Sequence, residues 1–222
     1  AIEINALWYN ALKIMESFAN LYKEKELSKK YAELAKKCKE SFMKKFYNKK
    51  RKCFDDLVGD NSIRPNQLFA IGLHYPVVEP NSVEAKTAFE TVTKKLLTPY
   101  GLKTLAKGEK CYREIYEGDQ IKRDMSYHQG ITWPWLLGIY SDSFLNIISA
   151  EKNKTKKKEL EEQYSKFAQN VEDTFYNEMY NRSTVGSISE LYDSAKPYEA
   201  KGAFAQAWSV AEVFRIIEKR NK

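Results

Sequence analysis

Hydrophobic and polar positions divide this chain into helical segments of two alternating kinds. Residues 27–46 carry one stripe of apolar side chains at helical spacing, and Lys and Glu fill most of the other positions. Residues 3–20, by contrast, are apolar on most sides. A helix with a single stripe lies at a surface, whereas a helix that is apolar all round must be surrounded by protein. The pattern therefore predicts outer and inner helices.

The same contrast repeats to the end of the chain. The expected inner helices cover residues 3–20, 65–74, 131–140 and 204–217, and the expected outer helices cover residues 27–46, 82–97 and 154–180. Asn81, after Pro80, is the expected N-cap of the second outer helix, at 82–97. Pro134 predicts that the 131–140 helix begins near Trp133, which leaves residues 127–132 as a loop.

Antiparallel helices that alternate between inner and outer positions are typical of an α/α toroid. These segments begin and end on an inner helix, so they account for only part of such a barrel. We expect an all-α fold, a partial (α/α)6 toroid of about seven helices, with residues 1–222 forming one portion of a barrel domain. A helical solenoid also alternates, but it has a fixed repeat period, which this sequence lacks.

Charge and composition exclude several classes of protein. The net charge of +7 could indicate nucleic-acid binding, but the basic residues are mostly Lys and crowd into residues 23–52 and 152–158. Nucleic-acid readers favour Arg interleaved with aromatic residues, so solvated outer faces of helices are the better interpretation. No apolar run reaches the length of about 18 residues that a membrane span requires.

The cysteine and histidine content indicates no metal site and no disulfide framework. Cys38, Cys53 and Cys111 are odd in number, widely spaced and form no CxxC pair, which favours reduced thiols. The chain has only 2 His residues, so a zinc site is not expected, and neither is another cofactor. Residues 1–5 do not resemble a secretory signal, and we expect a cytoplasmic protein.

Polar residues gather at the start of each inner segment. They are Glu3 and Asn5; Arg64, Asn66 and Gln67; Arg123, Asp124, Tyr127, His128 and Gln129; and Gln206. Inner helices of a toroid run parallel, so their N-termini meet at one end, where backbone N–H groups also point. Amide and guanidinium donors, carboxylate acceptors and aromatic faces suit a polyhydroxylated ligand. The sequence therefore predicts a sugar-binding pit.

Structural roles remain open for several of these residues. Asn5, Asn66, Gln67 and Gln206 also fit as helix caps or loop bridges, Arg123 and Asp124 fit as an ion pair, and Trp8, Trp135 and Trp208 fit as core residues. His128 lies beside Gly130 at a break in the helical pattern, which favours a binding or orienting role.

Six motifs together resemble one enzyme family. They are Glu3-Ile4-Asn5-Ala6-Leu7-Trp8-Tyr9-Asn10-Ala11-Leu12, Ile63-Arg64-Pro65-Asn66-Gln67, Thr98-Pro99-Tyr100-Gly101-Leu102, Tyr127-His128-Gln129-Gly130-Ile131-Thr132-Trp133-Pro134, Gly186-Ser187-Ile188-Ser189-Glu190-Leu191-Tyr192-Asp193 and Phe204-Ala205-Gln206-Ala207-Trp208-Ser209. In this order, and over nearly the whole chain, they resemble the amylo-α-1,6-glucosidase (glycogen-debranching) family.

The resemblance implies an (α/α)6 barrel related to glucoamylases, which hydrolyses the α-1,6-linked glucose at a glycogen branch point with inversion. Inversion uses two carboxyl groups about 6.5–9.5 Å apart, with room for a water molecule between them. Glu190 matches the family's general base, in a loop before the last inner helix. Trp133 joins the polar residues named above as a substrate-binding candidate, and the expected partner is an α-glucan such as glycogen.

The family's general acid is an Asp in a Trp-Met-Asp stretch upstream of residues 3–12. Asp124, Asp193 and Glu3 do not match that motif, so we expect this chain alone to be inactive. Apolar sides of residues 3–20 and 204–217 are expected to pair with the rest of the barrel or with a second copy. Two alternatives are a non-catalytic glucan-binding scaffold and another α/α-barrel glycosidase, such as a glucoamylase or a trehalose-type hydrolase.

Overall fold

Helices account for 59% of the chain in the computed structural model, which describes residues 1–220. These residues contain eight α-helices and two small antiparallel sheets. The chain divides into two compact units. The first unit contains residues 1–61, 66–91 and 142–150, and the second contains residues 62–65, 92–141 and those from 151 onward.

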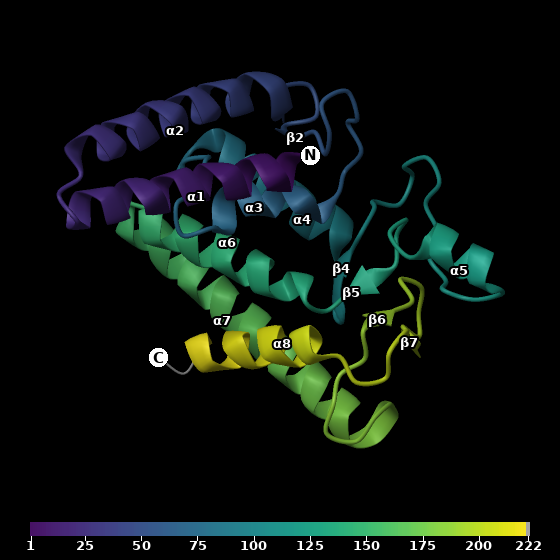
Figure 1. The fold of residues 1–222 in the computed structure, drawn as a ribbon. Coiled ribbons are helices and arrows are strands. Elements are labelled where there is room, and N and C mark those ends of the chain that lie inside the picture. The colour runs from purple at the N-terminus through teal and green to yellow at the C-terminus, as the bar shows by residue number, and fades with distance from the viewer. Residues whose placement is uncertain (221–222) are drawn as a thin grey trace. The chain divides into compact units, whose positions relative to one another are not determined.

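The first unit is built on a helical hairpin. Helices α1 (Ile2–Leu21) and α2 (Lys25–Phe46) run antiparallel and pack along their lengths (Figure 1). Apolar side chains at helical spacing on α2, among them Phe42 and Phe46, are buried as the stripe predicts. Strands β1 (Tyr47–Asn48) and β2 (Cys53–Phe54) then form a short antiparallel pair.

Two short helical turns and parts of two longer helices complete this unit. The turns are the 3-10 helix η1 (Pro65–Leu68) and α3 (Phe69–Gly72), and the longer helices are α4 (Val83–Leu96) and α6 (Leu136–Ala150), which contribute residues to both units. Ser143 on α6 donates a hydrogen bond to the carbonyl of Leu68 at 3.1 Å. Asn146 donates to the carbonyl of Ile71 at 2.8 Å. These bonds satisfy carbonyls that helices so short leave unpaired.

A five-stranded antiparallel sheet organises the second unit. Its strands lie in the order β3 (Leu97–Thr98), β4 (Gly101–Lys103), β5 (Thr132–Trp133), β6 (Leu191–Tyr192) and β7 (Ala200–Lys201). Leu102 pairs with Trp133, and Thr132 pairs with Tyr192. Although each strand is very short, the sheet joins three segments that are far apart in the sequence.

The helices of the second unit are α5 (Gln120–Ser126), α7 (Lys154–Asn177) with the π-helical turn η2 (Glu178–Arg182), and α8 (Ala207–Arg220). Asn153 caps α7, because its side chain accepts a bond from the N–H of Lys156. Helix α8 packs against α7 (Figure 1), and an ion pair between Arg220 and Glu172 joins them.

Each of the seven expected helices corresponds to an observed one, but some boundaries and one element differ. Residues 65–74 form only η1 and the four-residue α3. The helix expected to begin near Trp133 begins at Leu136, because Thr132 and Trp133 pair with two neighbouring strands instead. Helix α5 was not expected. Ser82, rather than Asn81, caps α4, and its hydroxyl accepts from the N–H of Ala85.

The helices expected to be inner differ from one another in how much of their surface is buried. Helix α6 is buried on most sides, as predicted. Helix α1 instead leaves a stripe exposed, which we call the α1 stripe and which consists of Ile4, Leu7, Trp8, Met15, Phe18 and Leu21. Phe204, Trp208 and Phe214 near and on α8 are also exposed. The expected apolar exposure along residues 3–20 and 204–217 is therefore present. No helix within residues 1–220 has both the length and the hydropathy needed to cross a bilayer.

Candidate functional site

The carboxylate of Glu190 is held from two sides within the second unit. Its Oε1 accepts a hydrogen bond from the hydroxyl of Tyr127, and its Oε2 accepts one from the backbone N–H of Ala203 at 2.9 Å. The backbone N–H of Glu190 donates to the carbonyl of Ala203 at 2.8 Å, which extends the β6–β7 ladder by one step. Glu190 therefore projects from the end of a strand and is only half-buried.

Tyr127, at the C-cap of α5, is fixed by aromatic neighbours. Its ring lies 4.7 Å from the ring of Trp133 and 5.8 Å from that of Tyr116, centroid to centroid. Trp133 Nε1 donates to the carbonyl of Tyr127 at 3.1 Å. Burial, followed by the hydrogen bond to Glu190, raises the pKa of the Tyr127 hydroxyl. The hydroxyl therefore stays protonated and can donate to Glu190.

Arg64 ties the segment after Tyr127 in place. Its guanidinium donates to the carbonyl of His128 at 2.7 Å and to the side-chain oxygen of Gln129 at 2.9 Å. The His128 ring stacks on Trp133 with centroids 5.5 Å apart. Burial and the positive charge of Arg64 lower the pKa of His128, although Glu190 acts in the opposite direction. A neutral imidazole can both donate and accept hydrogen bonds.

Gly130 lets two segments approach closely behind this cluster. Its φ of +129° is one that L side chains rarely adopt, and an added Cβ would lie 2.7 Å from the ring of Tyr112 and overlap the carbonyl of Arg113. The N–H of Arg113 donates to the carbonyl of Gln129 at 2.6 Å beside it. The segment 112–117 is thereby held against the Tyr127–Gln129 turn.

Exposed aromatic faces continue from the cluster onto α8. Trp208 lies 6.0 Å from Trp133 and stacks on Trp135 at 5.2 Å. It is 45% exposed, and Phe204 is 72% exposed. Phe204 directly follows Ala203, the residue whose N–H binds Glu190, so this exposed aromatic residue is next in sequence to a Glu190 contact. Such faces bind the apolar sides of sugar rings.

The structure brings together six of the predicted site residues. Arg64, Tyr127, His128, Gln129, Trp133 and Glu190 form one connected cluster in the second unit. Trp133 is only 3% exposed, so it supports Tyr127 and His128 rather than facing a ligand.

Three further predicted residues of this unit lie outside the cluster's hydrogen bonds. The Arg123 guanidinium donates to the carbonyl of Gly118 at 2.6 Å, which closes the loop before α5. Asp124 is exposed on the same helix. Gln206 precedes α8, and its backbone N–H donates to the carbonyl of Ile188 at 2.9 Å.

The remaining predicted residues belong to the first unit, where three have structural partners. Asn66 donates to a carboxylate oxygen of Asp56 at 3.0 Å, and Asn5 donates to the carbonyl of Ala1 at 2.8 Å. Gln67 is 1% exposed and accepts from the N–H of Phe54. These contacts fit the loop-bridging and capping alternative. That these residues and Glu3 meet Glu190 in one pit stays a prediction.

Sequence reasoning missed the residues that hold Glu190 from the second side. Ala203 supplies a backbone N–H, and Gly202 supplies space, because a Cβ there would overlap Glu190 Oε2. Tyr116 packs against Tyr127. The only signal in the sequence is the glycine itself, which becomes informative once the strand pairing between residues 191–192 and 200–201 is known.

The comparison with protein families agrees with the sequence motifs. A profile of the amylo-alpha-1,6-glucosidase family matches residues 1–215. Among solved structures, a protein titled "Sialidase" superposes with a TM-score of 0.71 at 16% sequence identity, over 98% of this chain and 19% of that protein. This likeness concerns the fold alone, and the chain spans about a fifth of the length of that protein.

Proposed function

Because the chain belongs to the amylo-alpha-1,6-glucosidase family, we propose that it forms the base-bearing part of a glycoside hydrolase. The proposed reaction removes α-1,6-linked glucose at glycogen branch points with inversion at the anomeric carbon. Glu190 acts as the general base that activates the attacking water. The substrate is an α-glucan, and no cofactor takes part.

The observation that carries this proposal is the way in which Glu190 is held. The Tyr127 hydroxyl and the Ala203 N–H each occupy one carboxylate oxygen, so the plane of the carboxylate is set before substrate binds. Each oxygen retains a further lone pair that can accept a proton from water. A fixed orientation of this kind favours proton transfer from a positioned water, and it supports the proposed role.

A polyhydroxylated substrate fits the surroundings of this carboxylate. His128, Gln129 and Arg64 supply hydrogen-bonding groups, and Trp208 and Phe204 supply exposed aromatic faces. We assign the orientation of the glucosyl unit to this cluster. We also propose that the helices of this chain form part of an (α/α)6 toroid. The alternation of helix types, the burial of α6 and the exposed α1 stripe support this fold.

Substitution of Glu190 tests the proposal directly. In an active full-length glucosidase that contains this segment, Glu190→Gln should lower kcat by about 100-fold or more, because the amide cannot take the proton from water. The matched control is Glu199→Gln, which changes an exposed carboxylate between β6 and β7. Full activity of Glu190→Gln would refute the assignment.

The same variant and a comparison of substrates separate the alternatives. A non-catalytic glucan-binding scaffold would show no hydrolysis in either form and little change in glucan affinity. A glucoamylase-like enzyme would hydrolyse linear α-1,4 chains faster than isomaltosyl branch stubs, and the proposed enzyme should show the reverse order.

We further propose that the isolated chain does not release glucose. Inversion requires a second carboxyl group to protonate the leaving oxygen. Asp193, a buried acid three positions after Glu190, is committed elsewhere, because it accepts from the N–H of Tyr116 at 2.7 Å and lies 3.8 Å from Lys201. Release of glucose from a branched limit dextrin by the purified chain would contradict this.

A further inference from the structure

The loop between β1 and β2 consists entirely of basic residues, and we call it the basic loop. Because Asn48 pairs with Cys53, the residues that connect the two strands are Lys49, Lys50, Arg51 and Lys52. The side-chain oxygen of Asn48 accepts from the N–H of Arg51 at 3.1 Å, and its carbonyl accepts from the N–H of Lys52 at 2.8 Å. These bonds fix the turn, while its three lysines are exposed.

The acidic residues that follow the basic loop do not neutralise these lysines. Asp55, Asp56 and Asp60 come next in the sequence, but none of them is exposed. Asp55 accepts from Asn48 Nδ2, and Asp56 accepts from Asn66 Nδ2, each at 3.0 Å. Within residues 1–220, the ammonium groups of the three loop lysines have no hydrogen bond or ion pair. The exposed charge at this loop is therefore positive.

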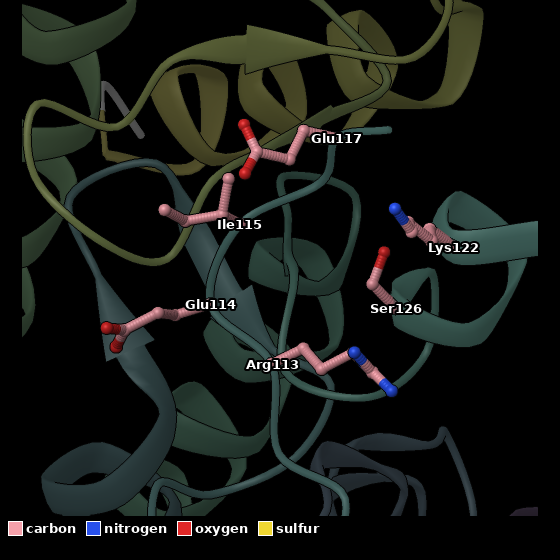
Figure 2. Close-up of a pocket in the computed structure, with 6 residues that line it drawn as sticks. All are labelled: Arg113, Glu114, Ile115, Glu117, Lys122 and Ser126. Carbon is pink, nitrogen blue, oxygen red and sulfur yellow. The ribbon is translucent and has the colours of Figure 1, made fainter. Parts of the chain in front are cut away.

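Two other charged surfaces carry both signs. On α2, Glu33 lies four positions before Lys37, a spacing at which opposite charges attract. The open pocket in Figure 2 is lined by two cationic and two anionic side chains, which are Arg113, Lys122, Glu114 and Glu117. A surface of mixed charge is satisfied by water and by its own ion pairs, whereas a surface of one sign attracts an oppositely charged partner.

An exposed apolar turn lies shortly after β2. The N–H of Asp60 donates to the carbonyl of Leu57 at 3.0 Å, which places Val58 and Gly59 at the corner. Gly59 has a φ of +94°, a value that such tight turns use and that glycine adopts at little cost. Leu57 is 43% exposed and Val58 is 63% exposed. A fixed turn therefore presents two apolar side chains to solvent.

Arg51 joins the basic loop to the apolar turn. Its guanidinium donates to the carbonyl of Asn61, the residue that follows the turn. Both segments belong to the first unit and lie beyond the C-terminal end of α2 (Figure 1). Cationic and apolar side chains are therefore neighbours on one surface. We call it the hairpin surface, and it consists of Lys49, Lys50, Lys52, Leu57 and Val58.

We propose that the hairpin surface binds an anionic lipid membrane. The lysines contact the negatively charged headgroups, and Leu57 and Val58 enter the boundary between headgroups and acyl chains. The ammonium group of lysine is a point charge on a flexible stem, which suits headgroups whose positions vary. Binding of this kind takes place at the membrane surface and needs no membrane-spanning helix.

Nucleic acid fits the hairpin surface less well. Proteins that bind single strands stack bases on exposed aromatic rings. The aromatic residues within 44–61 are Phe46, Tyr47 and Phe54, and none of them is exposed. The apolar turn would also have no partner on a phosphate backbone. The membrane proposal is independent of the proposed function, because it uses residues of the first unit that take no part in the Glu190 cluster.

Vesicle binding by the purified chain tests the lysines. The probes are vesicles of phosphatidylcholine alone and vesicles that also contain phosphatidylserine, and co-sedimentation gives the partition coefficient. Lys49→Gln with Lys50→Gln removes two charges of the basic loop. The matched control is Lys36→Gln with Lys37→Gln, which removes two charges at exposed positions of α2.

A second variant tests the apolar turn. Val58→Ser replaces an apolar side chain of the hairpin surface, and Val185→Ser makes the same change at a valine that is 82% exposed elsewhere. Both positions are exposed, so neither change should affect folding, and thermal unfolding confirms this.

We expect the unchanged chain to bind vesicles that contain phosphatidylserine and to bind phosphatidylcholine alone far more weakly. The Lys49/Lys50 variant should lose about 25-fold in partition coefficient, because each lysine near an anionic surface contributes about fivefold. Val58→Ser should lose about fivefold. Both controls should bind as the unchanged chain does.

Several results would overturn the proposal. One is the absence of any preference for phosphatidylserine, and another is an equal loss in the Lys36/Lys37 control. Lipid binding that neither the Lys49/Lys50 variant nor Val58→Ser weakens would assign it to another surface, such as the α1 stripe. Tighter binding of a single-stranded oligonucleotide that depends on Lys49 and Lys50 but not on Val58 would assign the surface to nucleic acid instead.

Discussion

At the scale of single residues, Tyr127 and Gly202 decide how the Glu190 carboxylate is oriented. The hydroxyl of Tyr127 donates a hydrogen bond to Glu190. Gly202 has no side chain, which leaves room for Glu190 Oε2. Neither role depends on the residue touching substrate. Both are therefore positioning roles, and each can be removed while the carboxylate itself is kept.

Tyr127→Phe should lower kcat about tenfold with little change in KM, because Glu190 loses one of the two donors that set its plane. Steady-state kinetics of the full-length enzyme measure this. Tyr116→Phe is the control, since it removes a hydroxyl from the neighbouring ring without touching Glu190. An equal effect of both variants would show that aromatic packing, and not the hydroxyl, matters.

Gly202→Ala should reduce both stability and activity, whereas Gly186→Ala should reduce stability alone. The two glycines have nearly the same φ, +72° and +74°, so backbone strain of roughly 1 kcal/mol is common to both. Only at Gly202 does the new methyl group meet Glu190, because a Cβ at Gly186 has no atom within 4 Å. Thermal unfolding and kcat measure the two effects. Normal activity of Gly202→Ala would contradict the crowding argument.

At the scale of elements, the π-helical turn η2 anchors the segment that leads to Glu190. Glu178 in this turn is 1% exposed and lies 3.6 Å from Arg182 Nε. Arg182 also binds the hydroxyl of Tyr100 and the carbonyl of Pro197. The hydroxyls of Ser183 and Ser189 are 3.1 Å apart, which closes the loop just before Glu190.

The Glu178 carboxyl should make stability depend on pH. Burial raises its pKa above the ordinary value of 4.5, although Arg182 partly offsets this. The folded state therefore holds the proton more tightly than the unfolded state, and the resulting stability is lost as pH rises through the raised pKa. The Tm of Glu178→Gln relative to the unchanged chain should increase from pH 4.5 towards neutral pH.

Thermal unfolding across that pH range checks this prediction, with Glu162→Gln as the control. Glu162 lies at an exposed position of α7, so its substitution should give a Tm difference that does not vary with pH. If the Tm difference for Glu178→Gln also did not vary with pH, burial of the carboxyl would have no effect on its protonation.

At the scale of the whole molecule, the α1 stripe is an exposed apolar surface along one helix. Its residues lie along one side of the helix, and Trp8 and Phe18 are 56% and 52% exposed. An exposed apolar surface of this kind indicates an interaction site. We propose that further helices of a barrel cover it, or a second copy when the chain is alone.

The isolated chain should therefore self-associate with increasing concentration, as measured by sedimentation equilibrium. Leu7→Lys with Phe18→Lys should make it monomeric, because two charges would enter the apolar contact. Tyr176→Lys with Tyr180→Lys is the control, since it replaces two exposed aromatic residues outside the stripe. A monomer at all concentrations before any substitution would contradict the proposal.

The sequence by itself determined most of the longer helices, the family motifs and most of the Glu190 cluster. Apolar spacing reports which side of a helix is buried, so α2 and α7 could be predicted from it. The 127–134 and 186–193 motifs similarly pointed to Tyr127, His128 and Glu190. These features depend on local chemistry, which the sequence carries directly.

Only the tertiary structure decided how Glu190 is held. Ala203 binds Glu190 through its backbone N–H, and Gly202 leaves room for Glu190 because it has no side chain. Neither role depends on a side chain that could be recognised in the sequence. Strands of two or three residues are too short to show a periodic pattern, yet their pairing sets the register that brings residues 127 and 190 together. Pairing between distant segments depends on the whole chain, and that is the physical reason it could not be predicted from local pattern.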